Sequence, residues 1–217
     1  MQKSARLLLY STGQMLGIFG GFIGVSIVLA WLLGGTDNLF GNYLIACTMM
    51  AMIFSGLLGT NAAGSLVNVG LALGATRRGM WGAMQLNLLV MAAGSLAIQC
   101  CTDWFLSRYP QAVSLNLSIT GATLPLYLAA LLFLFNAGAL GGMVESKPAK
   151  AAVGLCWVLG FAAVTGFGLV RSLGWMDRAT EALALAAATG VCAVGAAVCM
   201  VLLHRQVKRV QVRAIRG

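Results

Sequence analysis

The chain has 217 residues, of which 60% are hydrophobic and only 9% are charged, and its mean hydropathy is +0.91. Because a water-soluble globular domain carries about 25% charged residues, this composition excludes a water-soluble fold. The net charge of +9 does not indicate a nucleic-acid-binding protein, since the basic residues stand at the ends of apolar runs and form no basic face on a soluble body.

Six apolar runs without a charged residue predict six membrane-spanning helices. Each bilayer crossing takes roughly 20 apolar residues, and lipid offers the backbone no hydrogen bonds, so runs of this length must be helical. The predicted spans cover residues 15–33, 40–60, 80–101, 123–143, 151–170 and 182–203. We therefore expect an all-α, polytopic membrane protein whose single transmembrane domain covers residues 1–217.

The start of the chain has features of a signal peptide, because Lys3 and Arg6 precede an apolar stretch. The run over residues 15–33 is longer than the 7–15 residues of a signal sequence, which favours a retained first span. Before this span, residues 4–12 combine Leu7, Leu8 and Leu9 with the basic residues. This pattern predicts a short helix lying at the cytoplasmic interface.

The distribution of charge predicts the orientation of the spans. One set of span ends carries 11 of the 14 basic residues, namely Lys3, Arg6, Arg77, Arg78, Lys147, Lys150, Arg205, Lys208, Arg209, Arg213 and Arg216. The other set carries Arg108, Arg171 and Arg178 with four of the five acidic residues, Asp37, Asp103, Asp177 and Glu181. By the positive-inside rule, the first set is cytoplasmic, which places both termini inside.

The sequence contains no recognisable catalytic set. Charged residues inside spans usually mark ion sites and proton relays, and no predicted span contains one. The single His204 follows the last run beside Arg205, and one ligand makes no metal site. No stretch matches the phosphate-binding G-x-x-x-x-G-K-[ST] loop. We therefore expect no enzymatic activity, cofactor or metal in this chain, and a lipid-modifying membrane enzyme is the least favoured interpretation.

Small and polar residues inside the runs predict helix packing. Glycines four residues apart let helix backbones approach closely in lipid, and we expect the pairs Gly17/Gly21, Gly20/Gly24 and Gly138/Gly142 to pack within the chain. Five polar residues either line a path or form hydrogen bonds between helices: Gln85, Asn87, Gln99, Asn136 and Thr165. We expect most of them to serve packing.

The most distinctive stretch follows the predicted second span. Residues 61–78 are too polar and too rich in glycine for the centre of a span, so we expect them to fold back at the inner surface. Residues 68–78 have the sequence NVGLALGATRR and are followed by Gly82. A helical stretch that ends in L-G-x-[ST]-R-[RK] at this place resembles the permease subunits of bacterial ABC-2 type ABC transporters.

The resemblance implies several properties. The stretch would be a short cytoplasmic coupling helix that docks on a separate ATP-binding subunit, which would supply the ATP hydrolysis. It also implies a short amphipathic helix before the first span, six spans, and two cytoplasmic termini. The protein would lie in the bacterial plasma or inner membrane. A second permease copy or a paralogue would complete the transporter.

A docking element also has a physical rationale. Leu66, Val69 and Leu73 form an apolar stripe of the kind that seats a helix in a partner's groove. Arg77 and Arg78 are suited to acidic residues of the partner or to lipid phosphates. The predicted coupling residues are Leu66, Val69, Gly70, Leu71, Leu73, Gly74, Thr76, Arg77 and Arg78. The alternative is an ordinary inner loop, in which the two arginines obey the positive-inside rule and contact anionic lipid.

These observations favour a membrane-spanning permease subunit of an ABC exporter. Its expected partners are an ATP-binding subunit, a second permease copy or a paralogue, and membrane lipid, without nucleic acid. The alternative function is a non-transport membrane scaffold or assembly factor, whose basic tail over residues 205–216 recruits a protein or anionic lipid.

Overall fold

The computed structural model describes residues 2–35, 37–109 and 117–209, which are helical apart from their connections. The elements in chain order are α1 (Gln2–Leu32), α2 (Leu39–Ile45), α3 (Cys47–Asn61), the π-helical turn η1 (Ala62–Leu66), α4 (Val67–Ala72), α5 (Arg77–Leu106), α6 (Leu124–Met143), α7 (Lys147–Ser172) and α8 (Arg178–Arg209). The described residues contain no β-strand.

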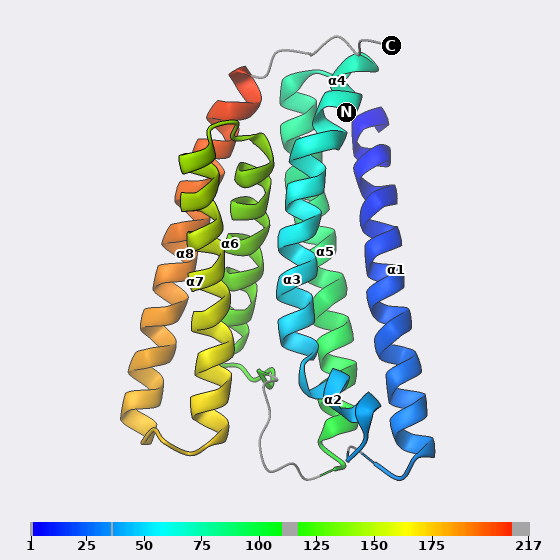
Figure 1. Ribbon diagram of the computed structural model, residues 1–217, viewed down its shortest axis with the longest axis vertical. Coiled ribbons are helices and arrows are strands. Elements are labelled where there is room, and N and C mark those ends of the chain that lie inside the picture. The colour runs from blue at the N-terminus through cyan, green and yellow to red at the C-terminus, as the bar shows by residue number, and fades with distance from the viewer. Residues whose placement is uncertain (1, 36, 110–116, 210–217) are drawn as a thin grey trace.

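Six helices of the described chain are long and apolar enough to cross a membrane. They are Leu8–Leu32, Cys47–Ala72, Arg77–Leu106, Leu124–Met143, Lys147–Arg171 and Arg178–Arg209. They run side by side along the long axis of the molecule, and α1 begins at the same end of the bundle at which α8 finishes (Figure 1). The prediction of an all-α protein with six spans is thus confirmed, and the protein is a multi-pass membrane protein.

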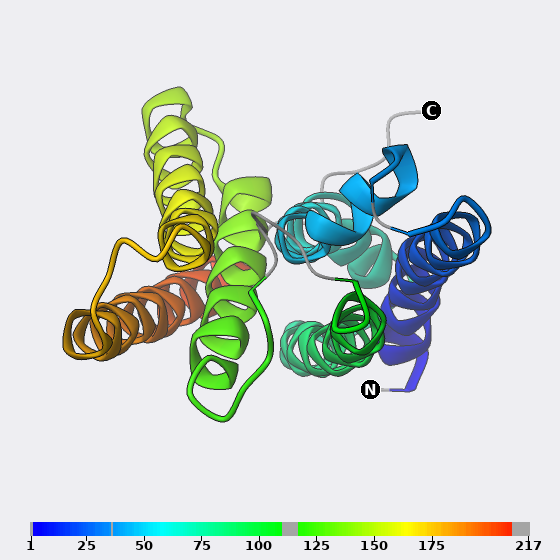
Figure 2. The ribbon, with the colours of Figure 1, turned by 90° about the horizontal axis from the view of Figure 1, so that it is seen from below.

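Helix α6 joins the two halves of the bundle. Seen along the helix axes, α7 and α8 lie on one side of α6, and α1 to α5 lie on the other (Figure 2). Helix α6 packs directly on α3, α7 and α8, while α1 packs mainly on α5. The apolar window of α6 is 72% buried, against 11% for that of α8. Helix α6 is therefore the core of the bundle, and α8 leaves most of its surface uncovered by the rest of the chain.

The contact between α3 and α6 depends on small residues. A side chain at Gly138 would collide with the carbonyl oxygen of Gly56, and one at Gly142 would lie 2.6 Å from the carbonyl oxygen of Thr60. The Thr60 hydroxyl donates to the Gly138 carbonyl over 3.1 Å. Close approach of this kind is how helices associate in lipid, so the predicted packing of Gly138 and Gly142 within the chain is confirmed.

The glycines of α1 behave differently. A Cβ added at Gly17, Gly21 or Gly24 would meet no atom within 4 Å, and one at Gly20 would meet only Ile98, at 3.4 Å. The expectation that the Gly17/Gly21 pair packs within the chain is therefore wrong. Gly17, Gly21 and Gly24 are exposed, whereas Gly20 is half-buried against Ile98 of α5, so the Gly20/Gly24 pair packs within the chain through Gly20 alone.

The expected interfacial helix over residues 4–12 is not a separate element. Helix α1 runs unbroken from Gln2 to Leu32. The chain contains neither glycine nor proline between residues 2 and 12 to interrupt it. The Thr12 hydroxyl donates to the Leu8 carbonyl over 3.1 Å, and both residues are fully buried. Packing thus begins before the predicted span, and the first helix is continuous.

The second span begins later than predicted and ends later. Residues 40–60 were expected to form it, but the chain turns at Ala46, and α2 is a separate short helix. The Asn38 side chain starts α2 by accepting a hydrogen bond from the Gly41 backbone N–H over 3.0 Å. The span then covers Cys47–Ala72. Hydropathy alone does not register a cap of this type, because Asn38 lies outside the apolar run.

The other predicted boundaries agree more closely. The fourth span, expected over residues 123–143, corresponds to α6 at Leu124–Met143. The third, fifth and sixth spans are contained in α5, α7 and α8, which each extend a few residues beyond the apolar run at both ends. Helices continue past the apolar part of a span because their polar ends reach the headgroup region.

Candidate functional site at the basic end

The two ends of the bundle differ in charge. At the end where α1 begins and α8 finishes, eight basic residues have described side chains: Arg6, Arg77, Arg78, Lys147, Lys150, Arg205, Lys208 and Arg209. Glu145 is the single acidic residue there, so the described charge is 8 − 1 = +7. We call this the basic end. At the other end, the acidic end, three basic residues face four acidic ones, which gives −1.

The predicted coupling segment lies at the basic end as the continuation of the second span. Helix α3 passes through the π-helical turn η1 directly into α4, without leaving helical conformation. The segment therefore does not fold back before Ala72, contrary to our expectation. Its glycines do not break the helix because they serve packing: a Cβ on Gly70 would lie 2.5 Å from the Met80 sulfur, and one on Gly64 would lie 3.6 Å from the Gly142 carbonyl.

The polar side chains of the segment form hydrogen bonds with backbone carbonyls in and next to the π-helical turn. The Asn68 side-chain amide donates to the Gly64 carbonyl over 3.1 Å. The Ser65 hydroxyl lies 2.9 Å from the Asn61 carbonyl and 2.7 Å from the Asn61 side-chain oxygen. Single π-helical turns inside α-helices occur frequently at functional sites. The polar side chains that excluded this stretch from the predicted span thus form hydrogen bonds within the helix.

The predicted apolar stripe is divided between the core and the surface. Leu66 and Leu71 pack against the core cluster at this end of the bundle. Val69 and Leu73 are 41% and 70% exposed. Because the spacing of four residues puts them on one helix face, Val69 and Leu73 form an exposed apolar edge, and Leu66 does not belong to it.

Helix α4 ends in a turn that the sequence accounts for. Gly74 has φ +85°, which an L side chain rarely adopts. The Ala75 N–H donates to the Gly70 carbonyl over 2.9 Å, and the Gly74 N–H donates to the Leu71 carbonyl over 3.0 Å. This pair of bonds defines the Schellman motif, in which glycine closes a helix.

Thr76 then starts α5 immediately after the turn. Its side-chain oxygen accepts a hydrogen bond from the Gly79 N–H over 3.0 Å, which is the usual N-cap contact. The sequence Gly74-Ala75-Thr76 thus reverses the chain within three residues. Arg77 and Arg78 are consequently held in the first turn of α5, where both are exposed.

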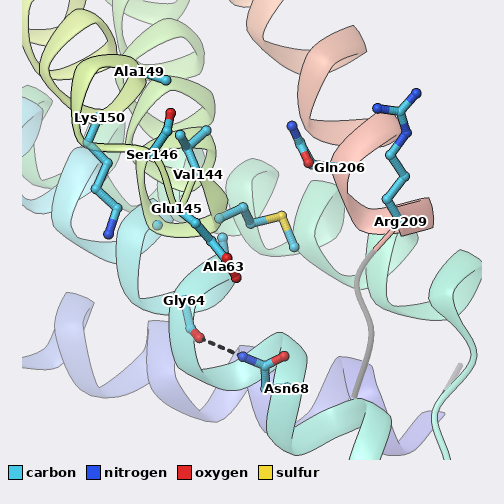
Figure 3. A pocket seen from close by; sticks show the side chains of 12 residues that line it. Ala63, Gly64, Asn68, Val144, Glu145, Ser146, Ala149, Lys150, Gln206 and Arg209 are labelled. Carbon is cyan, nitrogen blue, oxygen red and sulfur yellow. Dashed lines mark hydrogen bonds between the residues drawn. The ribbon is translucent and has the colours of Figure 1, made fainter. Parts of the chain in front are cut away.

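A cavity of about 760 Å³ lies beside this segment. Its walls come from the π-helical turn and α4, from the connection between α6 and α7, and from the end of α8. Figure 3 shows Glu145 and Lys150 on one side of the cavity and Gln206 and Arg209 of α8 across from them. The cavity is polar and carries charges of both signs, so it offers contacts to a polar or charged segment of another protein.

Sequence reasoning missed the residues that surround the segment. Glu145, Lys150 and Gln206 come from the α6–α7 connection, α7 and α8, and only the fold brings them beside Asn68 of the segment. No local spacing identifies such a set. The basic tail proposed for a scaffold lies only partly within the described residues: Arg205, Lys208 and Arg209 are exposed on α8, and residues 210–216 lie outside.

The polar residues inside the bundle have mixed surroundings. Asn136 and Thr165 donate to carbonyls of their own helices, whereas Gln99 contacts Thr48 on α3 at 3.3 Å. Asn87 is fully buried on α5, and neither atom of its amide has a hydrogen-bond partner among the described residues. A buried polar group without a partner costs about 1–3 kcal/mol, so Asn87 is not explained by helix packing.

The described residues contain no group of three or more histidine, cysteine, aspartate or glutamate side chains placed to hold a metal ion. His204 packs its ring against Trp81 at 5.0 Å between centroids. No protein-family model, no curated protein and no solved structure matches the chain. The resemblance to ABC-2 type permeases therefore stays a prediction that rests on residues 68–82.

Proposed function

We propose that this protein is the membrane-spanning permease subunit of an ABC exporter in a bacterial plasma or inner membrane. In this proposal both termini and the basic end are cytoplasmic. A separate ATP-binding subunit docks at the basic end and hydrolyses ATP, and this chain has no catalysis of its own.

The observation that carries the proposal is that the second span continues without a break into the exposed apolar edge formed by Val69 and Leu73. One helical body runs from Cys47 to Ala72 and ends beside the exposed Val69 and Leu73 and the paired arginines. Its middle part packs on α6, the core of the bundle, through contacts between small residues and backbone. A displacement at the end of α4 is thus connected to the α3–α6 contact by one continuous helix, along which we propose that ATP hydrolysis is coupled to the spans.

The positive charge of the basic end also favours this end as the docking surface. The described residues at the basic end carry +7, and Glu145 is too little acid to neutralise them within the chain. A complementary acidic surface on the ATP-binding subunit would steer association and fix its orientation. Arg77 and Arg78 follow the exposed apolar edge directly, so they are placed to form the first of these charge pairs.

The permease would work as a pair, either with a second copy or with a paralogue. The outward faces of α7 and α8 are apolar, with Leu155, Leu159, Val191 and Val194 all more than half exposed. Such faces fit lipid or a second permease, and the predominantly apolar spans favour an amphipathic or hydrophobic cargo over an ion. Asn87 is the described buried residue best suited to a polar contact along the path.

The proposal is tested by purifying the tagged protein in mild detergent from its native host. We expect an ATP-binding subunit to co-purify, as identified by mass spectrometry, and the complex to hydrolyse ATP. The double substitution Arg77→Glu/Arg78→Glu should abolish both. Arg178→Glu, which changes an exposed arginine at the acidic end, should leave both unchanged. Purification of the wild type without any ATPase would overturn the proposal.

The scaffold alternative draws on the exposed Arg205, Lys208 and Arg209 at the end of α8. Removal of the whole basic tail, residues 205–217, separates the two functions. A permease with an intact segment over residues 66–78 keeps its coupled ATPase activity after this truncation. A scaffold instead loses its bound partner.

A further inference from the structure

A second cavity at the basic end lies between the first turns of α5 and the last turns of α8. It has a volume of about 710 Å³ and is lined by Arg77, Arg78, Trp81, His204, Val207 and Lys208. The two helices reach it from parts of the chain that are far apart in sequence. Four of the six lining residues carry nitrogen donors on ionisable side chains, and no acidic residue is among them.

The floor of this cavity is apolar and aromatic. Val207 is 1% exposed and belongs to the core cluster at this end, against which Trp81 also packs. The rings of Trp81 and His204 meet edge to face, with 5.0 Å between centroids and 63° between planes. The Nδ1 atom of His204 is buried and has no hydrogen-bond partner among the described residues. The floor of the cavity therefore consists of an aromatic pair packed beside the buried Val207.

The cations above this floor are not explained by helix stability. Arg77 and Arg78 occupy the first turn of α5, where the positive end of the helix dipole makes basic side chains unfavourable. Lys208 adds a third cation from α8. Three cations above the aromatic floor repel one another, and an anion in the cavity would reduce that repulsion.

We propose that this cavity binds a phosphate group, held by Arg77, Arg78 and Lys208 above the floor formed by Trp81 and His204. Arginine pairs with phosphate oxygens through two parallel hydrogen bonds, and lysine adds a point charge. The edge-to-face contact with Trp81 holds the His204 ring beside these cations. The phosphate comes either from a phospholipid headgroup or from a soluble phosphate compound.

The surroundings connect this pocket with the membrane border. Tryptophan is enriched at the level of the lipid headgroups, and basic pockets between spans on the positive side bind anionic headgroups. The outward face of α8 near the pocket is apolar, with Val201 54% and Leu202 42% exposed. An acyl chain can lie along this face while the phosphate occupies the pocket.

The site does not rest on the coupling proposal. It shares Arg77 and Arg78 with the coupling segment and adds Lys208, His204 and Trp81 from outside that segment, so it would serve a scaffold as well as a permease. A bound phosphate would tie α8 to α5 at the basic end, where the described contacts between these helices are few.

The test is native mass spectrometry of the full chain in detergent, titrated with dioleoylphosphatidylglycerol. We expect the wild type to retain lipid and Arg78→Gln/Lys208→Gln to bind about tenfold more weakly. Arg6→Gln/Lys147→Gln is the matched control, because it removes two exposed basic residues from the same end but outside the pocket. This control should bind like the wild type. Lys208→Arg, which keeps the charge, should retain binding, and circular dichroism verifies that each variant is helical.

Two further arms identify the source of the phosphate. If a lipid headgroup fills the site, inorganic phosphate does not displace the bound lipid. If a soluble phosphate compound fills it, inorganic pyrophosphate binds to the wild type, and Arg78→Gln/Lys208→Gln loses that binding. The proposal is overturned if the pocket variant and the Arg6→Gln/Lys147→Gln control lose equal affinity for both probes, or if neither probe binds to the wild type.

Discussion

The acidic end and the basic end of the bundle organise their polar groups in opposite ways. At the acidic end, polar side chains are used to hold the protein's own chain together. The Asp103 carboxylate accepts hydrogen bonds from the Gln99 amide at 3.0 Å and from the Ile119 N–H at 2.7 Å. The Thr48 hydroxyl accepts one from the Leu117 N–H at 2.8 Å. These contacts fasten the connection before α6 to α3 and α5.

The helices at the acidic end are joined in the same manner. Arg171 at the end of α7 forms an ion pair of 2.7 Å with Glu181 in the first turn of α8. The Asp177 side chain accepts a hydrogen bond from the Thr180 N–H at 3.2 Å. At the basic end, by contrast, +7 of described charge lies beside two cavities. The acidic end is thus held by contacts within the chain, whereas the basic end keeps an excess of positive charge.

The largest expected effect on stability comes from breaking the Asp103 contacts. Asp103→Ala leaves the buried Gln99 amide and the Ile119 N–H without this acceptor, which should lower the free energy of unfolding by about 2 kcal/mol. Asp37→Ala removes an exposed acid of the same end and should change it little. Unfolding of the detergent-solubilised protein with SDS, followed by circular dichroism, measures both. Equal losses would show that Asp103 acts only through its charge.

Gly74 at the basic end and Gly174 at the acidic end close helices in the same way. Gly74 has φ +85° and Gly174 has φ +67°, and neither would place a Cβ within 4 Å of another atom. Substitution by alanine therefore costs only backbone strain, about 1 kcal/mol at either position. We expect Gly74→Ala to reduce coupled ATPase activity and Gly174→Ala to leave it unchanged. A loss of activity in Gly174→Ala of the same size would remove the functional distinction between the ends.

These examples show what the sequence predicts well. The six apolar runs predicted the six spans, because length and hydropathy are decisive in lipid. Gly74 and Thr76 were predicted only as coupling residues, and the structure adds that they close α4 and cap α5. The place of Arg77 and Arg78 at the basic end followed from the charge pattern.

The remaining features depend on tertiary contacts. Ala46 carries no signal for the turn that separates α2 from α3, so the second span was placed too early. The helix over residues 62–72 is retained because Gly64 and Gly70 are packed against other helices, which composition does not reveal. Lys208 and His204 meet Arg77 and Trp81 only in the fold, so the phosphate pocket was outside the reach of sequence patterns.

A smaller effect is expected at the ion pair between α7 and α8. Arg171 and Glu181 are 35% and 29% exposed, and pairs of this kind contribute about 0.5 kcal/mol. Arg171→Gln should lower stability by that amount, and the difference from the wild type should shrink in high salt. A salt-independent loss would mean that Arg171 acts through packing of its aliphatic stem.

The smallest effect concerns pH at the start of α8. The side-chain and backbone hydrogen bonds of Thr180 lower the pKa of Asp177 below its usual value of 3.8. Because the pKa is lower in the folded state, the stabilising effect is complete well above pH 3.8 and is lost as the pH falls through the folded pKa. The stability difference between the wild type and Asp177→Ala should therefore decrease in acid. A difference that is constant with pH would contradict this role of the charge.

Photo-crosslinking in native membranes tests whether the basic end is a docking surface. Benzoylphenylalanine in place of Leu73, which is 70% exposed at the basic end, is compared with benzoylphenylalanine in place of Trp175, which is 74% exposed at the acidic end. We predict that the first probe forms an adduct with an ATP-binding subunit, identified by mass spectrometry, and that the second does not. Adducts of position 73 with lipid alone, or the same protein adduct from both positions, would contradict a docking surface at the basic end.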